Sequence, residues 1–283
     1  MIEIQKSETP FVAHVTGASL GVLEDEAIWD EIREAWAQYP VLCFPNQKLS
    51  TEELEQVTTH FGGFGVDQFI DPMEGHPHVI EIKRAADERV KPFAADSWHS
   101  DWSFYEEPPA GTLLYGITIP PVGGDTLFAD CTAAFDALPP EQQRELESMR
   151  VLHSAILGYS TKGAFADDGK ERSMTIRVSE DAEARHAHPM VRVHPVTKRK
   201  TLFINPVYSV GIEGMEDADA AAFLGPLYAH LLQPQFQYRH KWSKDMLLLW
   251  DNRRVIHAAS GGYDGHARLL RRTTIAGEAV IPA

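Results

Sequence analysis

The length, composition and charge of the chain exclude several classes of protein before any motif is considered. Of its 283 residues, 43% are hydrophobic and 10% aromatic, which supports a sizeable packed core and excludes a disordered chain. The 41 acidic and 26 basic residues give a formal net charge of -15. That charge disfavours nucleic acids and anionic membranes as main partners.

The N-terminus and the cysteines favour a soluble cytoplasmic protein. The segment MIEIQKSETPFVAHV lacks the basic and apolar regions of a signal peptide, and no apolar run is long enough to span a bilayer. Cys43 and Cys131 lie far apart and have no metal-ligand spacing. We therefore expect two buried, free thiols.

Two helices are predicted near the start of the chain. Ile28, Ile32 and Trp36 recur at i, i+4 and i+8 within residues 24–38, which indicates a helix with one buried face. The next segment, YPVLCF, is typical of a buried strand. A second helix is expected to begin at Ser50, whose hydroxyl can cap it while Glu53 reaches back, and to end at a Gly-Gly pair.

From about residue 78 the pattern changes to short apolar runs separated by turns. The runs are HVIEI, GTLLYGITI, GDTLFAD, VRVH, KTLFIN, MLLLWDN, RVIHAA and LLRRTTIAG. Many short strands predict a sandwich or barrel. Helical insertions are expected at residues 139–149 and 216–232, the second broken or kinked at Gly225 and Pro226. No repeat or linker divides residues 1–283, so we expect a single domain.

The tripeptide from His99 to Asp101 is the first candidate for chemistry. In an extended strand, residues two apart point to one face, so this imidazole and carboxylate could share a metal ion. His-x-Asp alone is more typical of a solvated strand end than of a metal site. The candidate third ligand is His257, at the end of the buried run LLLWDNRRVIHAA.

The strand after His257 is dense in arginine. Arg268 and Arg272 face the same way, about 13 Å apart at roughly 3.3 Å per residue, whereas Arg271 faces the opposite side. An exposed, salt-bridged edge strand would explain this pattern, but the neighbouring leucines favour burial. Because residues 265–277 contain no Asp or Glu, we expect a bound carboxylate to supply the counter-charge.

Together these motifs resemble the iron(II)/2-oxoglutarate dioxygenases of the taurine dioxygenase and 2,4-dichlorophenoxyacetate dioxygenase (TauD/TfdA) family. The resemblance runs in order through VLCFPNQ, WHSDWSF, GGDTLFAD, HPMVRVHPVTKRKTLFIN, WDNRRVIHAA and RLLRRTTI. It implies a mainly β fold with flanking helices, a cupin-like double-stranded β-helix or jelly roll.

The resemblance also implies site residues and cofactors. It assigns His99, Asp101 and His257 as the catalytic residues and metal ligands of Fe(II). The cosubstrate 2-oxoglutarate would chelate the iron while its far carboxylate binds Arg268 and Thr126, and O2 would take the remaining position. The implied reaction hydroxylates, and thereby in some cases cleaves, a small molecule and releases succinate and CO2.

Substrate-binding residues are implied less directly. In the family, the arginine matching Arg272 holds the acid group of the substrate. Aromatic residues at or near pocket-lining positions, which would otherwise fill the core, are Trp102, Tyr159 and Tyr208. Asp71 replaces a histidine of the taurine site and Ala95 an asparagine, so taurine itself is not expected. An aryloxyalkanoate, a different alkylsulfonate or a related carboxylate is the expected anionic substrate.

Two further segments carry hypotheses. The long connection over residues 157–188 is expected to act as a lid. His186 and His188 are two residues apart within HAHP, but they lack a third ligand in a segment typical of a polar loop. We therefore expect no second metal site.

The residues alone do not exclude two other functions. A zinc or manganese jelly-roll hydrolase or isomerase would explain the three ligands but leave Thr126 and Arg268 without a role. A metal-free, anion-binding jelly roll would explain the arginines but not the ligands. Family resemblance also implies a homo-oligomer, either a dimer or a tetramer.

Overall fold

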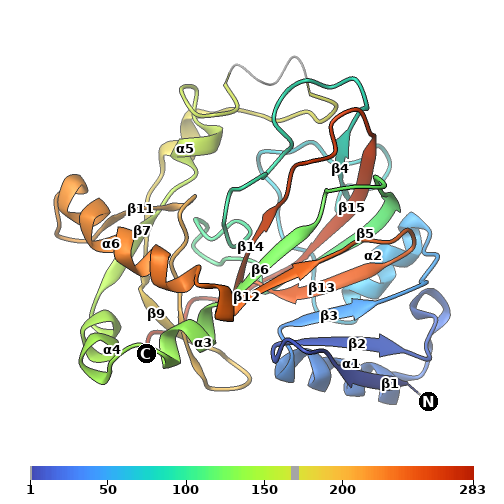
Figure 1. Cartoon of the computed structure of the whole chain (residues 1–283), viewed down its shortest axis with the longest axis horizontal. Helices are drawn as coiled ribbons and strands as arrows, with labels where there is room; N and C mark the ends of the chain where they lie inside the picture. Colours follow the sequence, from blue (N-terminus) through green and yellow to red (C-terminus); the bar gives the residue numbers. More distant parts are fainter. Residues whose placement is uncertain (1, 167–171) are drawn as a thin grey trace.

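One large sheet forms the centre of the molecule. The computed structural model describes residues 2–166 and 172–283 (Figure 1). The sheet order is β1-β2-β3-β13-β5-β15-β4, and its pairs are antiparallel except for β2 with β3. The strands are β1 (Glu3–Lys6), β2 (Val12–Thr16), β3 (Val41–Phe44), β13 (Leu247–Asp251), β5 (Gly111–Thr118), β15 (Arg268–Ile275) and β4 (Ile80–Arg84).

A smaller antiparallel sheet packs against one face of the large sheet and completes a sandwich. Its strands are β12 (Gln237–His240), β6 (Thr126–Asp130) and β14 (Val255–Ala259), paired in that order. Side chains of β13 alternate between the two faces. Leu248 and Trp250 join Phe128 between the sheets, whereas Leu247 and Leu249 join the core beneath the helices.

Helices α1 (Glu26–Gln38) and α2 (Thr51–Thr59) cover the other face of the large sheet. Trp29 and Ile32 of α1 are fully buried there. The predicted capping box of α2 is present: the Ser50 hydroxyl accepts from the Glu53 amide at 3.1 Å, and Glu53 accepts from the Ser50 amide at 2.6 Å. The helix ends at Thr59, just before the glycine pair.

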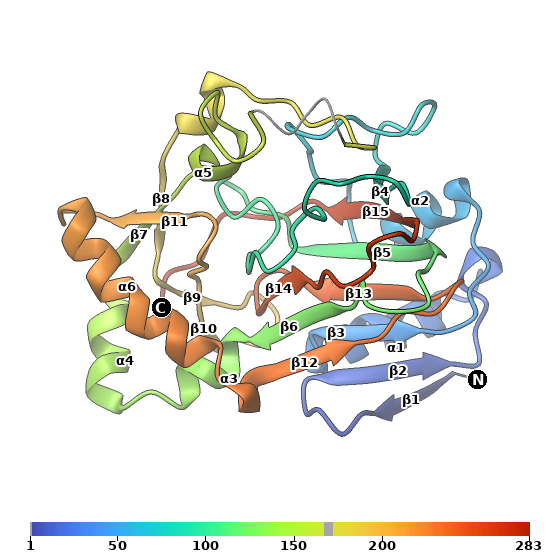
Figure 2. The same cartoon turned by 45° about the horizontal axis from the view of Figure 1, so that its top comes forward.

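Apart from η1, which packs against α2, the remaining elements gather at the end of the sandwich away from the N-terminus (Figure 2). The strands are β7 (Arg150–His153), β8 (His186–Pro189), β9 (Val191–Val193), β10 (Lys200–Leu202) and β11 (Ser209–Ile212). The helices are α3 (Cys131–Asp136), α4 (Pro140–Glu147), α5 (Ile156–Tyr159) and α6 (Asp217–Leu231). Short 3-10 turns are η1 (Leu20–Val22), η3 (Glu180–Glu183) and η4 (Pro234–Phe236).

Two local expectations need correction, and a third is confirmed. Helix α6 continues through Gly225 and Pro226, because the buried leucines of the helix hold it against its neighbours despite the missing amide donor. HAHP is strand β8, paired with β7, and not a polar loop. The burial expected for the arginine-rich strand is confirmed, because β15 lies between β5 and β4 and is not an edge strand.

Two other observations concern the whole chain. Cys43 and Cys131 are both free and buried, as expected. In the part of the chain that the structure describes, no helix combines the length and the apolar character needed to cross a membrane.

Candidate active site

His99 and His257 are brought together by a backbone bridge. His257 lies on β14, and His99 lies in the loop before β5. The His99 amide donates to the His257 carbonyl at 2.9 Å, and the His257 amide returns the bond at 2.7 Å. Asp101 lies in the turn that follows His99. The expected regular strand over these residues is therefore wrong, and the bridge takes its place.

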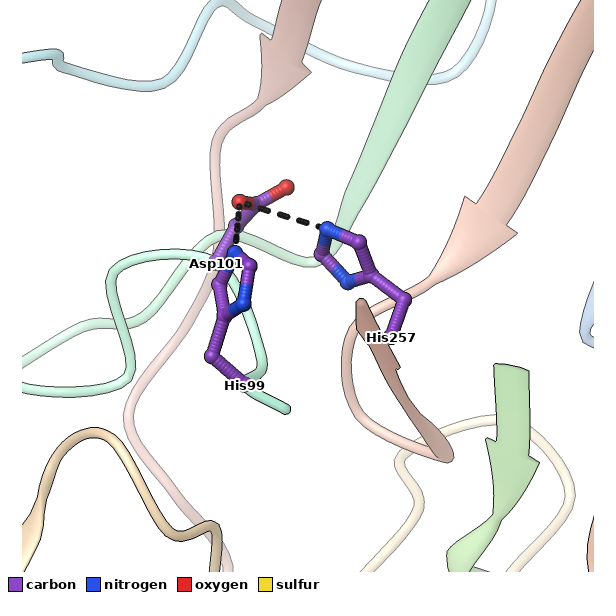
Figure 3. Close-up of side chains that lie close together, drawn as sticks. All are labelled: His99, Asp101 and His257. Carbon is purple, nitrogen blue, oxygen red and sulfur yellow. Dashed lines mark ion pairs between the residues drawn. The ribbon is translucent and has the colours of Figure 1, made fainter. Parts of the chain in front are cut away.

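The three side chains converge on one point. Asp101 Oδ1 lies 3.5 Å from His99 Nε2 and 3.8 Å from His257 Nε2 (Figure 3). All three side chains are buried, and their potential ligand atoms lie within 4.8 Å of one another. Among the described residues, this is the one group of three or more such side chains arranged to hold a metal. Two imidazoles and one carboxylate suit non-haem Fe(II) and leave coordination positions open.

Neighbouring groups orient the ligand atoms. The His99 Nδ1 proton points at the Ser97 carbonyl at 2.7 Å, which leaves Nε2 as the metal-facing lone pair. The Thr112 hydroxyl donates to Asp101 Oδ2 at 2.6 Å and leaves Oδ1 for the metal. The Asn252 amide donates to that hydroxyl at 2.9 Å. These bonds preorganise the site.

Electrostatics favour the protonation states that a metal requires. Burial lowers the pKa of His257 to about 3, and His99 adds to the effect, so the ring is neutral. Burial alone would raise the pKa of Asp101, but His257, Arg272 and His99 together hold it well below its usual range. The site therefore offers the neutral ring of His257 and a charged carboxylate.

Thr112→Val is expected to lower iron affinity about 10- to 100-fold, because Asp101 loses the hydrogen bond that orients it. Titration of the metal-free protein with Fe(II) under nitrogen would measure this change. Thr118→Val, at the exposed end of the same strand, is the matched control. Equal iron affinities of the two variants would refute an orienting role for Thr112.

A small cavity of about 50 Å³ lies beside both histidines, and Thr126 and Arg268 line it. Arg268 Nη2 donates to the Gly124 carbonyl at 3.1 Å. In residues 2–166 and 172–283, no carboxylate lies within ion-pair distance of this buried guanidinium. The Thr126 hydroxyl accepts from Trp242 Nε1 at 3.0 Å, so its own proton is available. The cavity thus offers a guanidinium and a hydroxyl to an anion.

A larger cavity of about 240 Å³ also borders the metal ligands, and His99 and Arg272 line both cavities. Its lining includes His99, Asp101, Trp102, Tyr159, Tyr208 and Arg272. The Arg272 guanidinium lies 5.1 Å from the Trp102 ring centroid. Most of the other lining residues are apolar. The cavity therefore suits a substrate with an apolar or aromatic body and one polar end.

The described part of the predicted lid borders this cavity. Leu157, Gly158, Tyr159 and Phe165 line it, and the segment contains α5 and η3, so it is not structureless. Residues 167–171 of the predicted lid lie outside the described residues.

Arg272 already has a carboxylate partner. Its Nη2 pairs with Asp67, which lies between α2 and β4, and its Nη1 lies 3.5 Å from Asp101 Oδ1. The absence of acidic residues near Arg272 in sequence therefore did not mean absence in space. Asp71 instead pairs with Arg177 at 2.5 Å, and it is not among the residues that line the larger cavity.

Sequence reasoning missed three residues of this site. Thr112 gave a usable signal, because a polar residue within an otherwise apolar strand needs a hydrogen-bond partner. Asn252 gave a weaker signal as a polar residue directly after a buried strand. Asp67 lies in a glycine-containing loop and gave no local signal.

The chain matches the family model described as "Taurine catabolism dioxygenase TauD, TfdA family" over residues 3–274. The chain belongs to this family. Membership makes it a dioxygenase, and the predictions of family, fold class and enzyme class are confirmed. Membership also favours an oxidative reaction over the two alternatives, a non-oxidative metal-dependent hydrolase or isomerase and a non-catalytic anion-binding protein.

Two curated relatives resemble this dioxygenase along most of its length. It is 38% identical to the α-ketoglutarate-dependent 2,4-dichlorophenoxyacetate dioxygenase of Cupriavidus pinatubonensis, with 89% of each chain covered. It is 29% identical to the (S)-phenoxypropionate/α-ketoglutarate-dioxygenase of Sphingobium herbicidovorans, over 98% of this chain and 95% of the relative.

A solved structure also resembles the dioxygenase along its whole length. The putative α-ketoglutarate-dependent taurine dioxygenase from Burkholderia xenovorans has a TM-score of 0.82 and 27% identity. The match covers 100% of this chain and 95% of that one. The jelly-roll architecture is therefore shared across the whole chain.

Proposed function

We propose that this dioxygenase couples oxidative decarboxylation of 2-oxoglutarate to hydroxylation of a small organic acid, using Fe(II) and O2. His99, Asp101 and His257 would hold the iron, and the products are succinate, CO2 and the hydroxylated substrate. One observation carries the proposal: the three ligands line two cavities, a small one with a buried guanidinium that has no carboxylate partner among the described residues and a larger aromatic one. One catalytic domain spans the chain.

The small cavity is assigned to 2-oxoglutarate. Arg268 and Thr126 would bind its far carboxylate, because the buried Arg268 guanidinium has no carboxylate partner among the described residues and the Thr126 hydroxyl accepts from Trp242 and keeps its own proton for the ligand. Bound iron would supply the activation of dioxygen. The protein supplies the binding, the orientation and the exclusion of water.

The larger cavity is assigned to the prime substrate. Trp102, Tyr159 and Tyr208 suit an aryl group, and the two relatives above are named for aryloxyalkanoates. An aryloxyalkanoate therefore fits better than a short alkylsulfonate. Hydroxylation of the carbon beside the ether oxygen gives a hemiacetal, which collapses to a phenol and a carbonyl compound.

Succinate formation tests the proposal directly. Protein loaded with Fe(II) under nitrogen is given 2-oxoglutarate and then oxygen, in the presence of aryloxyalkanoates, alkylsulfonates, sulfate esters or plain carboxylates. We expect aryloxyalkanoates to stimulate succinate release most. Absence of 2-oxoglutarate consumption with every compound, despite bound iron, would contradict the proposed reaction.

Arg272→Ala is expected to weaken the use of acidic substrates at least about tenfold, because a charge-assisted hydrogen bond is lost. Decarboxylation of 2-oxoglutarate without prime substrate should continue. Apparent KM values for both compounds measure the two effects, with Arg177→Ala on the surface as control. Equal loss of both activities would mean that Arg272 does not serve the prime substrate specifically.

Location and assembly are further parts of the proposal. A cytoplasmic location is supported by the two free cysteines, which are typical of reducing compartments. A homo-oligomer, dimer or tetramer, is supported by family resemblance. Light scattering during size-exclusion chromatography would measure the assembly.

A further inference from the structure

The two inward-facing arginines of β15 differ in their surroundings. Arg268 and Arg272 are both 5% exposed. Within the described residues, Arg268 has no carboxylate at ion-pair distance, whereas Arg272 pairs with Asp67. Arg268 is therefore ready for an anion, and Arg272 already has its counter-charge.

The position of Asp67 on the guanidinium determines which nitrogen atoms of Arg272 remain for a substrate carboxylate. A carboxylate binds arginine bidentately through Nη2 with either Nε or Nη1. In this protein Arg253 uses Nε and Nη2 for Asp251, both at 2.8 Å. Asp67 takes Nη2 of Arg272, and Nη1 faces Asp101 at 3.5 Å. Asp67 thus already uses the nitrogen that both bidentate modes share, while Nε of Arg272 has no hydrogen-bond partner among the described residues.

The segment that carries Asp67 is anchored on each side. The Gly65 amide donates to the Thr274 carbonyl at 2.9 Å, and the Phe69 carbonyl accepts from the Arg177 amide at 2.7 Å. Between these points, Val66 is 70% exposed and the Asp67 side chain is 14% exposed. The backbone on each side of Asp67 is therefore fixed, and the mostly buried carboxylate has one oxygen on Arg272 and one oxygen without a hydrogen-bond partner among the described residues.

Burial and ion pairing have opposing effects on the pKa values of Asp67 and Arg272. Burial raises the pKa of Asp67 even with Arg272 beside it. For Arg272, burial acts to lower the pKa, but Asp67 and Asp101 raise it above its ordinary value. The guanidinium thus stays charged, while Asp67 is held in place at a desolvation cost that its displacement would relieve.

We propose that Asp67 is a specificity-determining residue whose carboxylate competes with the acid group of the prime substrate for Arg272. The inference rests on the proposed function, because it concerns the same substrate pocket. It follows that the native pocket discriminates between acids and neutral molecules of the same shape less strongly than it would without the Asp67 carboxylate. Removal of the Asp67 charge converts the pocket into a selective acid receptor.

The test compares phenoxyacetate with its neutral analogue phenoxyacetamide. Dissociation constants are measured by calorimetry without oxygen, on protein loaded with Fe(II) and 2-oxoglutarate. In Asp67→Asn, phenoxyacetate is expected to bind about tenfold more tightly, since one charge-assisted hydrogen bond becomes available to it. Phenoxyacetamide should keep its native dissociation constant. Asp67→Ser should give the same result without an amide at this position.

Controls separate the local effect from a change in total charge or folding. Asp136→Asn removes one negative charge from an exposed pair with Arg199 and should leave both dissociation constants unchanged. Binding of 2-oxoglutarate to each variant reports an intact fold. If Asp67→Asn fails to fold, Asp67→Ser provides the comparison.

Two outcomes would overturn the competition. One is weaker or unchanged phenoxyacetate binding in both Asp67 variants, which would make Asp67 a residue that positions Arg272 for the acid. The other is an equal change for acid and amide. Neither outcome affects the proposed reaction. Succinate formation with the wider panel of compounds tests that reaction separately.

Discussion

Asp101→Ala is expected to abolish iron binding and, with it, iron-dependent consumption of 2-oxoglutarate. Asp101 provides the one negative charge of the ligand set, and its Oδ1 lies between the two histidine Nε2 atoms. Without it, the two histidines remain with the nearby Arg272 guanidinium, whose positive charge repels a cation. Fe(II) titration under nitrogen and succinate formation should both fall to background.

A second substitution separates charge from shape. Asp101→Asn keeps the size of the side chain but removes its charge, and it should also lose most iron affinity. Asp96→Asn is the matched control, because Asp96 is exposed and pairs with Lys91 at the surface. Full iron stoichiometry with native turnover in Asp101→Ala would exclude this residue as a ligand. His99→Ala should behave as Asp101→Ala does.

Local signals explain most of what could be predicted from the sequence. The capping box of α2 depends on Ser50 and Glu53 alone, and the buried face of α1 on helical periodicity. The core strands β5, β13 and β15 are nearly continuous apolar or buried runs. Each of these patterns is complete within about ten residues, so no tertiary information was needed.

Weakly patterned elements could not be predicted in the same way. Every residue of β1 is exposed, so that strand has no alternation of apolar and polar side chains. Helix α6 contains Pro226, whose local preference is overridden by burial of residues such as Leu224 and Leu227. In both cases contacts distant in sequence decide the structure.

In the site, too, some features have a local sequence signal and others depend on contacts between distant residues. The order of the motifs identified the metal ligands and the two arginines as candidates. The pairing of Arg272 with Asp67 spans 205 positions, and no sequence pattern links the two segments. The hydrogen bond from Thr112 to Asp101 requires β5 to pack next to the turn that holds Asp101. These contacts decide how the pocket treats charge, and they require the structure.

Arg268→Ala is expected to raise the 2-oxoglutarate concentration needed for half-maximal turnover about 100-fold, because a buried, charge-assisted contact to the far carboxylate is lost. Turnover at saturating 2-oxoglutarate should fall much less. Calorimetry on the iron-loaded protein should give a matching increase in the dissociation constant. Arg268→Lys should recover part of the affinity, since it restores the charge but not the bidentate geometry.

The neighbouring Arg271 provides the control for this prediction. It lies on the same strand but faces the other way, where it donates to Thr51 at 2.6 Å and lies 3.8 Å from Glu81. Arg271→Ala should therefore leave the 2-oxoglutarate requirement unchanged. An unchanged requirement in Arg268→Ala as well would remove the small cavity as the cosubstrate site. A loss confined to Arg268→Ala would attribute cosubstrate binding to the one buried guanidinium of β15 that lacks a carboxylate partner among the described residues.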